Sequence, residues 1–197
     1  PPPGFGVQRP MHDNLGSTNR LGQPRLVVKP HGLNALGRAG GRAFREVVRN
    51  LTRYQSLQCW KGGERLAEIE AASRRAFPDL MREIDGIAEG AEAPFDEIFL
   101  WNCRGDVPGN AGFSGSQGCT DVMIPGDRAA GLPAIIGHNE DDAADLSGHC
   151  FIVEAQPDAG PAFTSFCGPG LLPGHTFAMN AAGLVQTINH IRPHDQK

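Results

Sequence analysis

Apolar residues in the first half of the chain recur every three or four positions, which is the spacing of side chains on one face of a helix. Four helices are predicted on this basis, in residues 42–51, 64–77 and 78–91 and in a short stretch that begins at Pro94. Val27 and Val28 favour a short strand before them. The glycine-rich stretch that ends at Gly41 is not assigned to a helix.

The second half of the chain alternates short apolar runs with turn residues, a pattern typical of strands. The runs are residues 119–124, 132–137, 150–155, 162–167, 176–179 and 184–191. Asn180 to Gly183 has the composition of a hairpin turn. The pattern predicts a meander of antiparallel strands, and the fold class is therefore α+β, with the helices first and the sheet second.

The changes in composition along the chain divide it into three parts. Residues 1–26 are rich in Pro, Gly, Asn and Arg and are predicted to form a flexible arm. Residues 27–118 form the helical part, whose last segment, 105–118, consists almost entirely of small or polar residues, as in a linker. The strands follow in residues 119–197.

Composition and charge argue against several classes of function. Hydrophobic residues make up 40% of the 197 residues, which is enough for a core, and the formal net charge of −4 argues against nucleic-acid binding. No run of 18 apolar residues and no signal-peptide pattern occurs, so we expect no membrane span. The five cysteines are irregularly spaced and lack a CxxC pair, which argues against a zinc ribbon and favours a reducing, cytoplasmic setting.

The linker ends at Gly118, and Cys119 opens the first strand of the second half. The simplest interpretation is an interdomain linker followed by a strand cysteine. A functional interpretation is self-cleavage of the Gly118–Cys119 bond, because a glycine leaves its carbonyl sterically open to the thiol. The new α-amino group would have a reference pKa of roughly 7.7–8. It could therefore act as the general base for its own thiol.

A second group of polar residues, Gly137 to Asp142, follows an apolar run and lies at a predicted strand end. It could be a solvated acidic turn or could display catalytic side chains. A metal site is a further alternative, but no regular ligand spacing supports it, and we expect no metal and no cofactor. The residues that could serve as ligands are His138, Glu140, Asp141, Asp142, Asp145 and His149. Near the last strand end, Asn189 could donate a hydrogen bond to an oxyanion or could be a turn residue.

Three segments together resemble the acyl-coenzyme A:6-aminopenicillanic-acid acyltransferase family of N-terminal-nucleophile hydrolases, which is related to the choloylglycine hydrolases. They are Gly118-Cys119-Thr120, Gly137-His-Asn-Glu-Asp141, and Asn180-Ala-Ala-Gly183-Leu-Val followed by Asn189. Upstream, Asn102-Cys-Arg104-Gly-Asp106 is similar to the family's Asn-x-Arg-x-acid segment. The resemblance covers about residues 27–193.

The resemblance implies an αββα sandwich, made as a precursor that cleaves itself at Gly118–Cys119 into α and β chains. Residues 27–118 would be the pro-region or α chain, and residues 119–197 the start of the catalytic β chain. Cys119 would be the nucleophile, Asp141 would orient its amino group, and Asn189 would help to bind the oxyanion. His138 and Asn139 would support the substrate or the nucleophile. His138 stands where relatives often have arginine, and Glu140 where an apolar residue is more usual.

The resemblance also implies a cysteine amide hydrolase or acyltransferase that acts on linear amides through a thioester. We expect the substrate to be a small-molecule or peptide amide. The α and β chains of one precursor would be partners, and the protein could form a homo-oligomer. Family members continue past this sequence, so we expect the second sheet to be incomplete here. Two alternatives stay open: a catalytically inactive remnant that serves binding or assembly, and a metal-dependent hydrolase that uses residues 138–149.

Overall fold

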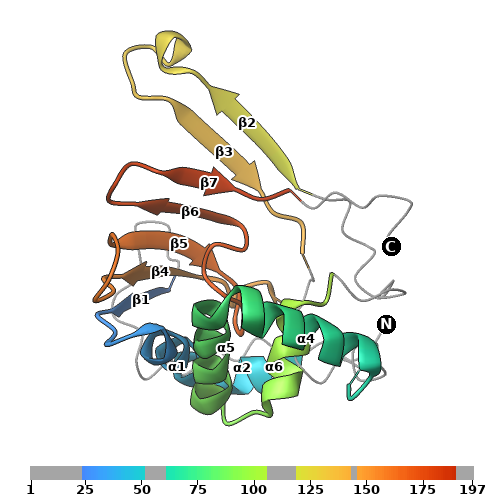
Figure 1. Ribbon diagram of the computed structural model, residues 1–197. Helices are drawn as coiled ribbons and strands as arrows, with labels where there is room; N and C mark the ends of the chain where they lie inside the picture. Colours follow the sequence, from blue (N-terminus) through green and yellow to red (C-terminus); the bar gives the residue numbers. More distant parts are fainter. Residues whose placement is uncertain (1–23, 52–60, 106–118, 143–145, 190–197) are drawn as a thin grey trace.

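A layer of helices packs against one face of a sheet in the computed structural model (Figure 1). The structure describes residues 24–51, 61–105, 119–142 and 146–189. Most of the predicted arm 1–26, most of the linker 105–118, and Gly118 lie outside these residues. The mixture of helices and strands confirms the α+β class.

The helices of the first half form where the apolar spacing predicts them, with one addition. They are α1 (Leu33–Ala43), α2 (Arg45–Leu51), α4 (Glu64–Ala76), α5 (Pro78–Ala91) and α6 (Phe95–Asn102). Pro78 begins α5, and Pro94 caps α6, as expected. The prediction was wrong between residues 32 and 43, because the glycine-rich stretch is helical and α2 starts three residues later than predicted.

Glycines are what allow α1 to lie directly against α5. A Cβ added at Gly37 or Gly41 of α1 would lie within 3.0 Å of the α5 backbone, and a Cβ at Gly86 or Gly90 of α5 would meet α1 in the same way. Glycine costs helix stability in isolation, but here it permits a backbone-to-backbone approach that no other residue would allow. The glycines that weaken the local helix signal therefore stabilise α1 through packing.

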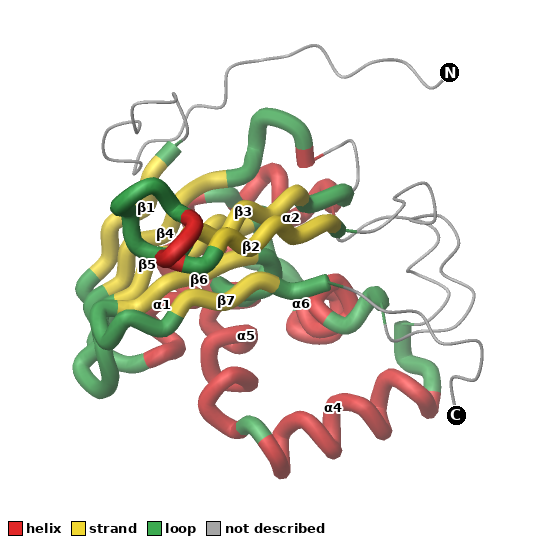
Figure 2. Tube along the Cα trace, turned by 90° about the horizontal axis from the view of Figure 1, so that it is seen from above, coloured by secondary structure: helices red, strands yellow, loops and turns green. Residues whose placement is uncertain are grey.

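The strands that the structure describes form two sheets and not a single meander. β4 (Phe151–Ala155), β5 (Phe163–Cys167), β6 (Phe177–Asn180) and β7 (Val185–Thr187) are antiparallel neighbours, as predicted. β1 (Arg25–Val28) adds to β4 in parallel. Within the described part of the chain, β2 (Thr120–Ile124) and β3 (Ile135–Asn139) pair only with each other, joined by a short connection that includes the 3₁₀ helix η2 (Gly126–Arg128). The hairpin lies next to β7 (Figures 1 and 2).

The core lies between the helices and one face of the larger sheet. Phe151 and Val153 of β4 are buried there, and Phe151 stacks on Phe44 between α1 and α2 at a centroid distance of 4.1 Å. Trp101 of α6 is completely buried. The opposite face of the sheet carries Val27, Met179 and Val185, each about half exposed. The sheet thus has one buried face and one open face.

The helices that the structure describes are too short or too polar to cross a membrane.

Candidate functional site

The register of the β2–β3 hairpin determines which side chains can meet. Asp121 pairs with His138 and Thr120 with Asn139, and the same register, continued by one residue, places Cys119 opposite Glu140. Residues two apart in a strand, and residues directly opposite each other, share a face of the sheet. Cys119, Asp121, His138 and Glu140 therefore lie on one face of the hairpin.

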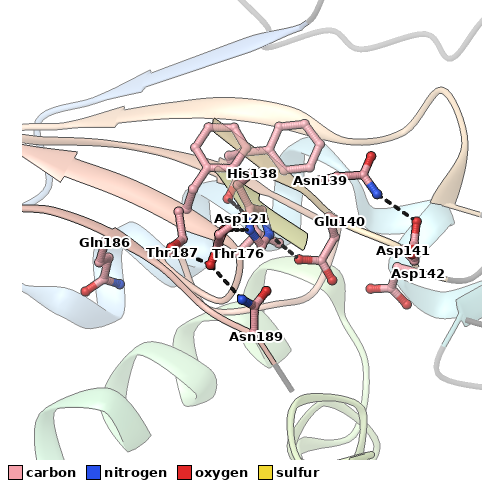
Figure 3. Close-up of polar contacts among 12 residues, drawn as sticks. Asp121, His138, Asn139, Glu140, Asp141, Asp142, Thr176, Gln186, Thr187 and Asn189 are labelled. Carbon is pink, nitrogen blue, oxygen red and sulfur yellow. Dashed lines mark hydrogen bonds and ion pairs between the residues drawn. The ribbon is translucent and has the colours of Figure 1, made fainter. Parts of the chain in front are cut away.

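His138 lies between two carboxylates on that face (Figure 3). Its Nδ1 is 2.7 Å from Asp121 Oδ1, and its Nε2 is 3.1 Å from Glu140 Oε2. The side chain is only 2% exposed. Burial by itself would lower the pKa of His138, but the hydrogen bonds to Asp121 and Glu140 outweigh it, and the pKa is raised above its ordinary value. The ring is held in a fixed orientation.

Asp121 connects the hairpin to the end of the larger sheet. Its Oδ2 accepts hydrogen bonds from Thr187 Oγ1 at 3.1 Å and from Asn189 Nδ2 at 2.6 Å (Figure 3). The hydrogen bond to His138 is the main reason that the pKa of Asp121 is lowered, and those from Thr187 and Asn189 add to it. Asp121 is thus ionised in the folded protein and fixes His138 relative to β7.

Cys119 lies at the open end of this arrangement. Its Sγ, a ring nitrogen of His138 and a carboxylate oxygen of Glu140 all lie within 4.8 Å of one another. Cys119 is half-buried, directly before β2, and so is accessible from solvent. The arrangement puts a thiol next to a histidine that a carboxylate orients, which is the general geometry of an activated nucleophile.

Two other cysteines have environments that suppress reactivity. Burial, followed by the charges of Asp142 and Glu140, raises the pKa of Cys150 to about 11. Complete burial raises the pKa of Cys167 well above its ordinary value. Since the thiolate is the reactive form, neither is a suitable nucleophile.

Asn139 and Asp141 alternate with His138 and Glu140, and their side chains hydrogen-bond to each other. Asn139 Nδ2 donates to Asp141 Oδ1 at 2.9 Å (Figure 3). Asp141 is not part of the group that Cys119 forms with His138 and Glu140. Its expected role toward the amino group of the nucleophile stays a prediction.

The segment from Asn102 to Arg104 binds two loops near the site through hydrogen bonds and an ion pair. Arg104 forms an ion pair with Asp142 at 2.8 Å and lies over the Trp101 ring. Asn102 donates to Gly170 O and accepts from Leu172 N, at 2.8 and 3.0 Å. These bonds join α6 to the loop after β3 and to the β5–β6 connection. The upstream motif thus positions the loops.

The structure brings together some of the residues singled out from the sequence and adds others. Cys119 and His138 meet, and Asn189 reaches the same cluster through Asp121. Asp121, Thr187 and the role of Glu140 were missed. The alternation of side chains could have revealed Asp121, since it lies two residues after Cys119 and so shares its face.

Comparisons with known proteins connect this site to a family. Residues 128–197, which include His138, Asp141 and Asn189, match the family model of acyl-coenzyme A:6-aminopenicillanic acid acyl-transferase. The beta-alanyl-dopamine/carcinine hydrolase of Drosophila melanogaster is 27% identical over 175 residues. That alignment covers 77% of this chain and 44% of the relative, so the chain spans less than half the length of the curated relative it matches. The resemblance seen in the sequence motifs is confirmed: residues 128–197 of this chain are similar to the acyl-coenzyme A:6-aminopenicillanic acid acyl-transferase family.

Proposed function

We propose that this chain belongs to an amide hydrolase or acyltransferase that uses Cys119 as an N-terminal nucleophile after self-cleavage. The observation that carries the proposal is the Cys119, His138 and Glu140 group on one face of the β2–β3 hairpin, and two of its members, His138 and Glu140, lie in the segment that matches the family. The hydrolase relative supports the reaction class.

Self-cleavage would begin in the precursor, where the nitrogen of Cys119 is still part of a peptide bond. The thiol must then lose its proton to another group, and a ring nitrogen of His138 and a carboxylate oxygen of Glu140 both lie within 4.8 Å of the sulfur. The thiolate attacks the Gly118 carbonyl carbon, the C–N bond to Cys119 breaks, and the nitrogen takes up a proton. Water hydrolyses the resulting thioester, which leaves a Gly118 carboxylate, restores the thiol and makes the α-amino group of Cys119 a new chain end.

Turnover would use the same thiol. The α-amino group takes the proton of Cys119, and the thiolate attacks the substrate amide. The substrate amine leaves with a proton, and water or an acceptor amine resolves the thioester. Asp141 would orient the amino group, Asn139 would hold Asp141, and Asn189 would donate to the oxyanion. Asn189 would have to exchange its bond to Asp121 for one to the substrate.

The open face of the sheet supports a sandwich with a second sheet. The register aligns Val27, Glu154, Thr164, Met179 and Val185 in one row across all five strands of that face. Three of the five are apolar and about half exposed. A second layer over this face would bury them and would enclose Cys119, since Asp121 and Thr187 join the hairpin to the same face.

The relative, named a beta-alanyl-dopamine/carcinine hydrolase, supports a proposal for the substrate class. We propose small aminoacyl amides as the substrates of this chain.

Trapping of the acyl-enzyme tests the proposal. Purified protein is incubated with a panel of aminoacyl amides, quenched in acid and mapped by mass spectrometry. The expected result is one acyl adduct on Cys119, lost in Cys119→Ala and retained in Cys150→Ser. Added hydroxylamine should yield the hydroxamate. An adduct elsewhere, or turnover that survives in Cys119→Ala, would exclude this nucleophile. Self-cleaved protein with no adduct for any amide would favour a binding remnant.

A further inference from the structure

The Cys119, His138 and Glu140 group combines three different ligand types in one place. A thiolate sulfur, an imidazole nitrogen and a carboxylate oxygen lie within 4.8 Å of one another. These are the three ligand atoms that zinc prefers in proteins. From zinc–ligand bonds of about 2.0–2.3 Å in a tetrahedron, the ligand atoms of a zinc site should lie roughly 3.3–3.6 Å apart. Side-chain movements of about one ångström would therefore suffice.

A residue outside this group already holds the His138 ring in place. Asp121 Oδ1 faces Nδ1 of His138 at 2.7 Å, and Nε2 points toward Glu140. Histidines that bind metal ions almost always donate their other ring nitrogen to a carboxylate or carbonyl, which fixes the tautomer and the ring. Asp121 is itself held by Thr187 and Asn189. The chain thus supplies a carboxylate–histidine pair whose outer nitrogen faces Glu140, with the Cys119 sulfur in the same group.

Charge favours a divalent ion at this position. A thiolate and the Glu140 carboxylate together carry two negative charges, which balance those of Zn²⁺, and His138 adds a neutral ligand. Glu140 is about one fifth exposed and Cys119 is half-buried, so an ion could enter from solvent. Arg104, which follows α6, is paired with Asp142 in the loop after β3.

We propose that Cys119, His138 and Glu140 bind one zinc ion, with a fourth position left for water. Zinc binding displaces the proton of the thiol and any proton on Nε2, and no electron is transferred. If Cys119 is the nucleophile proposed above, the ion takes up the sulfur lone pair and is a reversible blocker of both self-cleavage and turnover. The binding of zinc itself does not depend on that function.

The test uses the whole chain, stripped with EDTA and kept in a non-chelating reductant. Zinc binding is measured by calorimetry, and cobalt is used as a probe because a cobalt–thiolate bond gives a charge-transfer absorption. We expect one zinc per chain and a cobalt–thiolate band. Cys119→Ser should abolish the band, and His138→Gln should weaken zinc binding at least tenfold. Asp121→Asn, which does not contact the ion, should weaken it about 10- to 100-fold.

Matched controls are Cys150→Ser and His31→Gln, since these residues lie outside the group, and both should bind zinc as the wild type does. Alkylation provides a second measure in unsubstituted protein: zinc should protect Cys119 from iodoacetamide, and EDTA should restore the reaction. Absence of stoichiometric binding, or unchanged affinity in both His138→Gln and Asp121→Asn, would overturn the site. Zinc that stimulates amide hydrolysis would overturn the blocking role. Zinc binding by a chain that never cleaves itself would leave the site intact and contradict only the proposed function.

Discussion

His138 is held on both ring nitrogens, and this fixes the geometry around Cys119. Asp121 lies on one side of the ring and Glu140 on the other. Asp121 in turn depends on Thr187, the last residue of β7, and on Asn189, two residues further on. The position of the histidine is therefore coupled to contacts some 50 residues away in sequence. Substitutions in β7 should change the position of His138 relative to Cys119.

Asn189 provides a residue-level test of two roles. If Asn189 donates to the oxyanion, Asn189→Ala should lower kcat by about 10²–10³ with little change in KM. If Asn189 only holds Asp121, Asn189→Ala should have the same effect as Thr187→Val, which removes the other donor to the same carboxylate oxygen. Steady-state kinetics on both variants and on the double variant, with melting temperatures, separate the roles. Equal small losses in both variants would remove Asn189 from the chemistry.

Asp141 is expected to orient the amino group of Cys119, and this role predicts a kinetic effect without a structural one. Asp141→Asn keeps the shape and the neighbour Asn139 but removes the charge. The loss of a hydrogen bond to a charged group costs about 1.5–3 kcal/mol, so kcat should fall about 10- to 100-fold. Asp127→Asn in the exposed η2 turn is the control. If Asp141→Asn retains wild-type kcat across the neutral range, the assigned role is wrong.

Helices α1 and α5 pack through glycines, and this contact dominates the helical layer. Gly41 faces the α5 backbone, whereas Gly40, its neighbour in the same helix, has nothing within 4 Å of an added Cβ. The two positions share a helical backbone and differ in what surrounds them. Alanine substitutions at these two positions therefore separate the destabilisation caused by steric crowding from the stabilisation caused by higher helix propensity.

Gly41→Ala should destabilise the protein by about 1–3 kcal/mol, because the methyl group forces the helices apart. Gly40→Ala should instead stabilise it by roughly 0.5–1 kcal/mol through helix propensity. Urea unfolding measures both. Similar stabilisation by the two substitutions would show that α1 and α5 do not approach as closely as described.

Elements with a strong local signal could be predicted from the sequence, and elements that depend on distant partners could not. α4, α5 and α6 have apolar stripes or proline starts, and six apolar runs gave six strands to within a few residues. α1 was missed because its glycines signal a loop unless α5 is considered. The separation of β2 and β3 from the larger sheet was missed because pairing order is set by long-range contacts.

The same distinction applies to the candidate site. Cys119 and His138 stand in recognisable sequence motifs. Asp121 and Thr187 have no such motif, and their importance comes from meeting across two sheets. Gly118, the other half of the cleavage site, lies outside the described residues, so the cleavage itself stays a prediction.

At the scale of the whole molecule, one acid lies buried between the helices and the sheet. Glu83 of α5 is 4% exposed, and among the described residues its Oε1 has no hydrogen-bond partner. Burial raises the pKa of Glu83 from 4.5 to about 7. The folded state therefore binds a proton that the unfolded state has lost between these two pH values. Its contribution to stability is fully present below pH 4.5 and is lost as the pH rises to about 7.

Glu83→Gln should remove this loss. Relative to wild type, the variant should gain about 3 kcal/mol in free energy of unfolding between pH 4.5 and pH 8. Glu89→Gln, at an exposed position of the same helix, should show no such gain. Urea titrations at the two pH values measure both variants. A constant difference between Glu83→Gln and wild type would mean that Glu83 is not buried as a neutral acid.

The central claim is that Cys119 becomes the first residue of a catalytic chain, and intact-mass analysis with N-terminal sequencing tests it most directly. Wild-type protein should give two chains whose masses sum to the precursor plus one water, and the second chain should begin Cys-Thr-Asp. Cys119→Ala should give one unbroken chain, and Cys150→Ser should cleave as the wild type does. An active wild-type preparation with no chain that starts at Cys119 would contradict the account.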